Sequence, residues 1–241
     1  MFATAKIVGQ QVRSTKLSTS CSSAIKVKEG TVKKNPAIGI KVRGKVKKVP
    51  HDLLDRNELD KLYEGYPAHS LHDKRNKVIL GLLVFQGLTT GDIKRLRIQH
   101  VKLNEGKLHV PGTPAHVHRG GINSRVLELK ANQLLELRQY IQEIRPQQIR
   151  KQTDKLFVTE HGKENIQKAI NWLSVKLRSQ VKHYVNVDQL RASVITEWLK
   201  EKDVRIVQYM AGHKKVKSTK QYKAARLENL QQALDQYHPM K

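Results

Sequence analysis

The longest apolar run in the chain is VILGLLVF at residues 78–85, and it constrains the fold more than any other stretch. A run this continuous is buried on all sides when it is helical. It is far shorter than the roughly 18 residues that a membrane span requires, so we expect a core helix and no membrane partner. The surrounding sequence extends this helix over residues 71–86, and Gly87 is well placed to end it.

The first 50 residues are unsuited to a packed core. They contain twelve Lys or Arg against a single acidic residue, and no aromatic residue follows Phe2 until Tyr63. Such a stretch cannot bury enough apolar surface to offset the entropy lost on ordering. We therefore predict a flexible basic arm over residues 1–50 and a globular domain over residues 51–241. The arm is a solubilising tail or follows nucleic-acid phosphates; a transit peptide is the third alternative.

The charge of the chain points to a polyanionic partner. Lys and Arg number 46 against 21 Asp and Glu, which gives a formal net charge of +25. Nucleic acid is the partner that best fits this excess. Cys21 is the only cysteine, so no internal disulfide and no cysteine-based metal site can form. We expect a reducing, intracellular setting.

From residue 51 onward the sequence predicts a mainly helical α+β domain. Asp55 and Glu58 have the spacing of a capping box, which indicates a helix that runs to Tyr63. Three stretches predict a small three-stranded antiparallel sheet, with strands at 98–103, 107–110 and 125–130 and a long loop over residues 111–124. A short strand is also expected at 155–159. The other predicted helices cover residues 71–86, 90–97, 132–145 (stopping at Pro146), 166–179, 188–201, 204–211, 219–224 and 226–237.

The helix that begins near residue 188 carries a charged side chain on its apolar side. Arg191 lies beside the stripe formed by Leu190, Val194 and Trp198. A guanidinium is rarely left unpaired where water is excluded, and its planar fork matches a carboxylate or a phosphate. The sequence therefore allows two interpretations of Arg191, a buried ion pair or part of a ligand site.

A second group of polar residues follows the next predicted helix. His213 begins an expected loop, and Tyr222 follows nine residues later. Ser218 or Thr219 can cap a short helix whose first turn carries Tyr222. A phenol, with an ordinary pKa of about 10, attacks phosphorus at neutral pH only if a base or nearby cations assist it. The preceding arginine, this histidine and the lysines around it are groups of that kind.

Three short motifs together resemble a known family. They are DQLR at 188–191, MAGH at 210–213 and STKQY at 218–222. In this order they are similar to the C-terminal half of the catalytic domain of the tyrosine recombinases, also called the phage integrase family. Weaker similarity extends back to about residue 51 through QGLTTGDI at 86–93.

The resemblance implies strand exchange on double-stranded DNA. Tyr222 would attack the scissile phosphate, release a 5′-hydroxyl and hold the DNA as a 3′-phosphotyrosine. Arg191 would bind the non-bridging oxygens, and His213 would hydrogen-bond the phosphate. The family also implies that no metal, cofactor or small-molecule substrate takes part, and that several copies associate in a synaptic complex on DNA. The expected location is the nucleoid in a bacterial cytoplasm.

The chain departs from the family pattern at two positions. Thr89 stands where the family usually has an arginine, although Asp92 keeps the acidic position, and Asp188 stands where a histidine is usual. The loss of one preorganised contact to the reacting phosphate costs roughly 10²- to 10³-fold in rate. A catalytically impaired DNA-binding protein of the same fold is therefore the alternative hypothesis. A third is a basic RNA-associated protein in which the spacing is accidental.

Other cationic residues could supply the missing charge. The lysine that the family carries between its second and third strands has no clear match, and His118 and Arg119 are the candidates in that loop. Lys215 is a further candidate phosphate contact. His109, His116 and His118 raise the alternative of a zinc site, but the usual cysteine or carboxylate ligands are missing. The candidates to replace the absent arginine are Lys94, Arg95, Arg97 and Arg119.

The remaining aromatic residues are expected to pack inside the domain. They are Trp172, Trp198, Tyr63, Tyr140, Tyr184 and Tyr209. Leucines at 227, 230 and 234 give the last predicted helix an apolar face. This face packs within the domain or, as the family suggests, docks on a neighbouring protomer.

Overall fold

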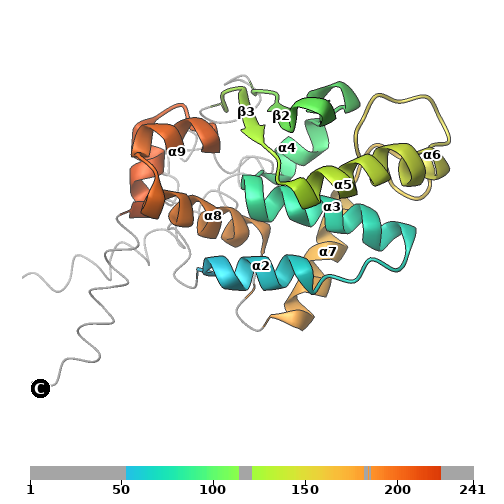
Figure 1. Cartoon of the computed structure of the whole chain (residues 1–241), viewed down its shortest axis with the longest axis horizontal. Coiled ribbons are helices and arrows are strands. Elements are labelled where there is room, and N and C mark those ends of the chain that lie inside the picture. The colour runs from blue at the N-terminus through green and yellow to red at the C-terminus, as the bar shows by residue number, and fades with distance from the viewer. Residues whose placement is uncertain (1–52, 114–120, 182–183, 185, 224–241) are drawn as a thin grey trace, which may run out of the picture. The chain divides into compact units, whose positions relative to one another are not determined.

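Helix α3 (Leu71–Gln86) lies in the middle of the described structure, as its continuous apolar run predicts (Figure 1). The computed structural model describes residues 53–113, 121–181, 184 and 186–223. The Ser70 side chain caps the start of α3 by accepting a hydrogen bond from the Asp73 amide. Gly87 ends the helix with φ at +56°, a conformation that favours glycine. Both predicted ends of this helix are confirmed.

Helices from both halves of the described chain surround α3. The first of them, α2 (Arg56–Glu64), begins at the predicted capping box, in which Asp55 and Glu58 bond each other's backbone amides. The helices that follow α3 are α4 (Thr90–Arg95), α5 (Ala131–Gln139), α6 (Arg145–Gln148), α7 (Gln167–Gln180), α8 (Val187–Glu201) and α9 (Val204–Ala211). Residues 216–223 form a further helix. α2, α5, α7 and α8 all contact α3, so the core forms around it.

The sheet has three antiparallel strands in the order β1–β2–β3. β1 (Val101–Lys102) pairs with β2 (Lys107–Val110), and β2 pairs with β3 (Arg125–Glu128). Leu108 lies opposite Leu127 in this register, and both face the core. The mainly helical architecture with a small antiparallel sheet is therefore confirmed. The alternation of β3 also turns Arg125, two residues before Leu127, toward the interior.

The predicted strand at 98–103 is shorter than expected, and the one at 155–159 is not found among the described residues. Only Val101–Lys102 of residues 98–103 pairs as a strand, because residues on both sides of it form 3₁₀ turns. Residues 155–159 form no strand among the described pairings; Lys155 makes a single bridge to Arg97. A periodic pattern in a short segment says which side chains are buried but does not supply the neighbouring backbone that a ladder needs.

The prediction that a helix stops at Pro146 is wrong. Residues Tyr140–Ile144 form a π-helical turn after α5, and α6 then continues with the proline in its first turn. A proline is tolerated there because the first amides of a helix have no intrahelical acceptor. The wider π turn before it removes the clash that an α-helical turn would create.

The aromatic residues divide between core and surface. Trp198, Tyr63, Tyr140 and Tyr184 are buried as predicted. Trp172 and Tyr209 are not, with 72% and 51% of their surfaces exposed. α7 turns Ile170 and Leu173 inward, which places Trp172 on its outer side. In the part of the chain that the structure describes, no helix is long and apolar enough to cross a membrane.

Candidate active site

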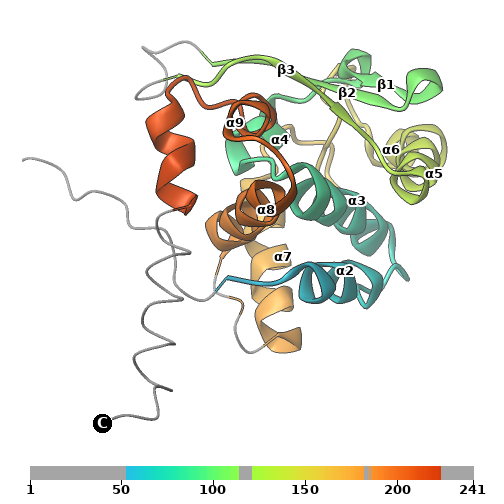
Figure 2. The same cartoon turned by 60° about the vertical axis from the view of Figure 1, so that its left-hand side comes forward.

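Three helical segments gather the residues of the sequence motifs on one side of the domain. Figure 2 shows α8, α9 and the helix at 216–223 side by side, with β3 above them. α8 contacts α9, and α9 contacts β3. A side chain from each of the three predicted positions, Arg191, His213 and Tyr222, lies in this region. The spacing in the sequence therefore corresponds to proximity in space.

Asn186 positions the start of α8. Its side chain accepts a hydrogen bond from the Gln189 amide, so Asn186 is the N-cap. Asp188, which stands where the family usually has a histidine, lies inside the first turn of the helix. A carboxylate there interacts favourably with the positive end of the helix dipole. Arg191 follows one turn later on the buried side, as its apolar neighbours predict.

Arg191 joins the ends of two helices. Its Nη1 donates to the carbonyl of Gly87, and its Nη2 donates to the carbonyl of Ala211 at 2.7 Å. Nη2 also lies 3.2 Å from Nε2 of His213. These contacts use three of the five N–H groups of a guanidinium. Among the described residues the partners of Arg191 therefore include no carboxylate of a buried ion pair, and donors are left for an anionic ligand.

The ring of His213 is fixed from both sides. Nδ1 lies 2.9 Å from the Thr219 hydroxyl, while Nε2 faces Arg191. Because a guanidinium can only donate, Nε2 accepts, and the ring proton is then on Nδ1 and donated to Thr219. Burial, together with the charges of Arg191 and Arg125, lowers the pKa of His213 to about 4. The imidazole is therefore neutral at pH 7.

Thr219 has a different role from the one expected of it. The helix that carries it begins at residue 216, so Thr219 lies within the helix and neither it nor Ser218 is an N-cap. Thr219 is fully buried, and its hydroxyl forms the hydrogen bond with Nδ1 of His213. Tyr222 is accordingly beyond the first turn, where the helix dipole is weak. The prediction that the first turn of this helix carries Tyr222 is therefore wrong.

Tyr222 stacks on His213. The two ring centroids are 5.9 Å apart and the rings are almost parallel, at 10°. Burial raises the pKa of the Tyr222 phenol, and the positive charge of Arg191 opposes that shift. The phenol is consequently protonated at neutral pH in the free protein, and its activation requires added positive charge or the removal of its proton.

A second cluster of charged residues adjoins the site, and its Arg125 was not among the residues predicted from the sequence. Arg125 donates to the Asp92 carboxylate at 3.0 Å, and both side chains are fully buried. Arg95 binds the other oxygen of Asp92 at 2.6 Å, and the Thr89 amide donates to the carboxylate as well. The sequence signal that could have identified Arg125 was its inward-facing position in the alternating pattern of β3.

The other predicted phosphate contacts are placed less closely. Lys215 is exposed, and no hydrogen bond from its side chain is found among the described residues. His118, Arg119 and His116 lie in the segment 114–120, outside the described residues. Of the side chains that the structure describes, no three His, Cys, Asp or Glu come together as a metal-binding group.

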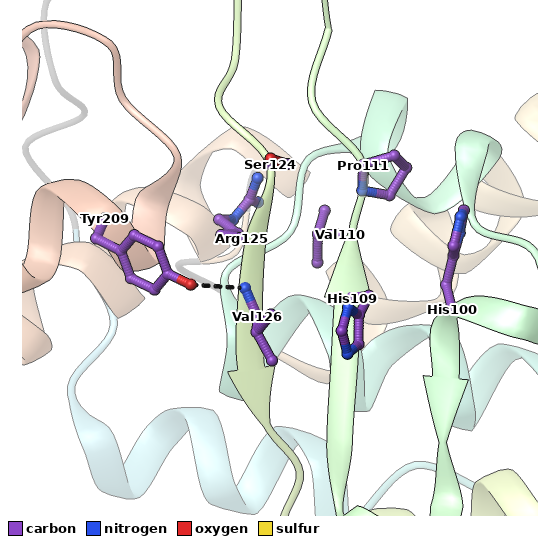
Figure 3. A pocket seen from close by; sticks show the side chains of 8 residues that line it. All are labelled: His100, His109, Val110, Pro111, Ser124, Arg125, Val126 and Tyr209. Atoms are coloured by element: carbon purple, nitrogen blue, oxygen red, sulfur yellow. Dashed lines mark hydrogen bonds between the residues drawn. The ribbon is translucent and has the colours of Figure 1, made fainter.

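A hollow of about 300 Å³ opens on the outer face of the sheet (Figure 3). It is lined by His100, His109, Val110, Pro111, Ser124, Arg125, Val126 and Tyr209. His109 and Val126 are cross-strand partners on the exposed face, and the Tyr209 hydroxyl accepts a hydrogen bond from the Val126 amide at 3.0 Å. The hollow thus belongs to the outer side of β3, and the guanidinium of Arg125 lies on the inner side.

Comparison with known proteins gives one family and a consistent set of relatives. Residues 52–228 match the phage integrase family. The tyrosine recombinase XerD of Staphylococcus aureus is 28% identical over 218 residues, which are 88% of this chain and 71% of that protein. XerD of Staphylococcus saprophyticus is 27% identical with the same coverage.

Solved structures share the fold. A crystal structure of XerA recombinase is 21% identical with a TM-score of 0.59, covering 95% of this chain and 77% of that one. The XerH site-specific recombinase, bound to a palindromic difH substrate in a post-cleavage complex, is 20% identical with a TM-score of 0.63. That match covers 82% of this chain and 56% of the XerH chain. At these identities the similarity establishes the architecture.

Proposed function

The chain belongs to the phage integrase family of tyrosine recombinases, and from this we propose that Tyr222 is the nucleophile with which it breaks and rejoins DNA strands. One observation carries the assignment. The ring of Tyr222 stacks on His213, and His213 in turn contacts Arg191, so three groups suited to phosphoryl transfer form a continuous cluster. The charge of +25 supports a polyanionic substrate.

The proposed reaction conserves bonds and protons. The Tyr222 oxygen forms a bond to phosphorus while the bond from phosphorus to the 5′ oxygen breaks. The phenol loses one proton and the leaving 5′-hydroxyl gains one, so no net proton is consumed. Because a phosphodiester is exchanged for another phosphodiester, the step is reversible, and attack by a different 5′-hydroxyl rejoins the strand. The chemistry requires no cofactor.

Arg191 and His213 hold the reacting phosphate in this proposal. Arg191 uses its remaining N–H groups on a non-bridging oxygen, where charge develops as Tyr222 attacks. His213 accepts from Arg191 in the free protein, but the Thr219 hydroxyl can either accept or donate. The ring can therefore exchange tautomer and donate from Nε2 to a phosphate oxygen when DNA is bound. Arg119, His118 and Lys215 are proposed as auxiliary contacts to the backbone.

The proposed partners follow from the same site. Double-stranded DNA is the substrate, since a phosphotyrosine bond conserves a strand for rejoining to a second duplex. Two duplexes must be held together for exchange, so we propose that several copies associate on DNA. The relatives are bacterial, which favours a bacterial cytoplasm and its nucleoid as the location. Residues 1–50 are proposed as a basic arm that follows DNA phosphates.

The test is trapping of a covalent adduct. The protein is incubated with nicked duplexes prepared from the DNA that flanks its own gene, in which the cleaved end diffuses away and the adduct accumulates. We expect a band that resists denaturation with wild type and none with Tyr222→Phe. Tyr209→Phe is the matched control, because Tyr209 is an exposed phenol on the adjacent helix, and it should react as wild type does. Equal adduct from Tyr222→Phe and wild type contradicts the assignment.

The second candidate is a DNA-binding protein of the same fold with little or no catalysis. Thr89 favours it, because a hydroxyl that caps α4 contributes no positive charge to a phosphate. This candidate predicts salt-dependent duplex binding with no adduct from wild type. Preference for RNA over duplex DNA at matched salt would instead support a basic RNA-associated protein.

A further inference from the structure

Arg125 is a buried charged residue that the reaction above does not use. Its side chain is fully buried, and only Nη2 has a partner, the Asp92 carboxylate. Nε and Nη1 have no hydrogen-bond partner among the residues that the structure describes. Buried polar groups in folded proteins are nearly always hydrogen-bonded, so two free donors on one guanidinium require an explanation.

The free donor Nη1 lies at the site. A Cβ atom added to Gly212 would be 2.6 Å from Nη1 of Arg125 and 2.8 Å from Cγ2 of Ile122. Nη1 is therefore against the residue that precedes His213, whose ring contacts Arg191. Beyond the effect of burial, the charge of Arg125 lowers the pKa of both Arg191 and His213. Two guanidiniums thus approach His213 from different elements, Arg191 from α8 and Arg125 from β3.

The charges around Asp92 do not balance. One carboxylate binds both Arg95 and Arg125, which leaves an excess of one positive charge. A buried excess of this kind is unfavourable unless an anion compensates it. Arg95 is less enclosed, with a side chain that is 30% exposed, so solvent screens it. The uncompensated charge therefore lies nearest to Arg125.

We propose that Arg125 is a second catalytic arginine, whose Nη1 donates to a non-bridging oxygen of the scissile phosphate while Nη2 stays on Asp92. The inference rests on the proposed function. Asp92 holds the guanidinium in place, and Arg191 binds the other non-bridging oxygen. Arg125 acts only as a hydrogen-bond donor in this step, so no proton is transferred. Since Nη1 is buried in the free protein, the side chains around it must shift when DNA binds.

The test compares two substrates for each protein. The first is the nicked duplex that yields the adduct, and the second carries a methylphosphonate at the scissile position, which replaces one charged non-bridging oxygen with a methyl group. On the ordinary duplex we expect Arg125→Gln to cleave about 10²- to 10³-fold more slowly than wild type, the cost of one lost phosphate contact. On the methylphosphonate of the correct stereochemistry we expect the two proteins to differ by less than about threefold, because no charge is left for Arg125 to stabilise.

The quantity compared is the ratio of one protein's cleavage rates on the two substrates. An unfolded fraction lowers both rates by the same factor, so it leaves this ratio unchanged. Arg95→Gln is the matched control, because it removes the other arginine of Asp92 and should have the same ratio to wild type on both substrates. Arg125→Lys, which keeps a charge beside Asp92, covers the case in which Arg125→Gln does not fold, and it should show the same convergence on the methylphosphonate.

The outcomes separate the two proposals. If wild type forms no adduct on the ordinary duplex, the proposed function fails and Arg125 has no such role. If wild type forms the adduct but the Arg125 variants keep the same defect on both substrates, Arg125 is structural and only this inference is overturned. Equal rates for Arg125→Gln and wild type on the ordinary duplex overturn it as well.

Discussion

Arg145 and Arg191 are both buried and both donate to backbone carbonyls, yet their surroundings differ. Arg145 donates to the carbonyls of Thr153 and Lys155, which are close to it in the sequence. Arg191 donates to the carbonyl of Gly87, 104 residues away, and to that of Ala211. Burial lowers the pKa of both guanidiniums. Burial and carbonyl contacts alone thus do not distinguish a structural arginine from one proposed to bind the reacting phosphate.

The difference lies in the groups beside the guanidinium. Arg191 is next to a neutral histidine that stacks on a tyrosine, with a second arginine nearby. Arg145 donates hydrogen bonds to a loop, and among the described residues no histidine is its partner. A buried arginine indicates a site when proton-transferring or nucleophilic groups share its enclosure. The following predictions test that distinction.

The largest effect is expected from exchanging each arginine for methionine. Arg191→Met should abolish detectable adduct, a loss of more than about 10³-fold, because the main phosphate contact is removed. Arg145→Met should leave three donor contacts unmade and reduce the free energy of unfolding by about 1–3 kcal/mol, while its folded fraction cleaves at the wild-type rate. Urea unfolding and cleavage rates measured on the same samples check both. A loss of cleavage in folded Arg145→Met would remove the distinction.

The pKa of His213 predicts a pH dependence of stability. Its folded-state pKa of about 4 is below the ordinary histidine value, so the unfolded chain binds the extra proton between those two values. The contribution of the neutral ring to the free energy of unfolding is complete above about pH 6.5 and is lost as pH falls toward 4. The loss amounts to at most about 3 kcal/mol. Wild type and His213→Gln should therefore differ less in unfolding free energy at pH 4.5 than at pH 7.5. A constant difference contradicts the buried neutral ring.

Alanine substitutions at two glycines separate the effect of backbone strain from the effect of displacing residues of the site. Gly212 and Gly106 have similar conformations, with φ at +71° and +64°. Alanine at Gly106 meets only a Leu134 methyl group at 3.6 Å, whereas alanine at Gly212 would meet Arg125 at 2.6 Å. Both should lose about 1–3 kcal/mol from strain, but only Gly212→Ala should also slow cleavage. Equal cleavage by the two variants would show that Arg125 and His213 tolerate displacement.

Thr219→Val should have a moderate effect on activity. The substitution keeps the shape of the side chain but removes the hydroxyl that orients His213. We expect cleavage to slow by about tenfold, since a neutral hydrogen bond contributes about 1–1.5 kcal/mol. Thr219→Ser retains the hydroxyl and should restore most of the rate. If serine and valine are equally slow, the methyl group rather than the hydrogen bond is what matters.

The smallest effect is expected at Trp172. Because its side chain is 72% exposed, Trp172→Gln should change the free energy of unfolding by less than about 0.5 kcal/mol. Trp198→Gln is the contrasting variant, since Trp198 is buried and should be much more sensitive. Thermal unfolding of the two proteins measures this, and a large loss at Trp172 would mean that α7 is covered in solution.

Local patterns were sufficient for most of the helices and for the order of the proposed reactive residues. The apolar run from Val78 to Phe85 could be satisfied only by a helix buried on all sides, and the capping residues around α2 defined its start. The set Arg191, His213 and Tyr222 was suggested by the resemblance of its motifs, in their order and spacing, to the family. The helical patterns depend on contacts within a few residues along the chain, so no knowledge of distant segments is required for them.

Contacts between distant segments were not accessible in this way. The alignment of Arg125 with Asp92 and Gly212 joins β3, α4 and the end of α9, and sequence spacing alone cannot show that these elements meet. The exposure of Trp172 and the hydrogen bond between Thr219 and His213 also depended on which face of each helix packs against the rest of the domain. Burial and pairing of a side chain are set by packing across the whole domain, whereas helical period and chemical type are local. The chain itself therefore specified the reactive groups, and their electrostatic environment arose only when the domain folded.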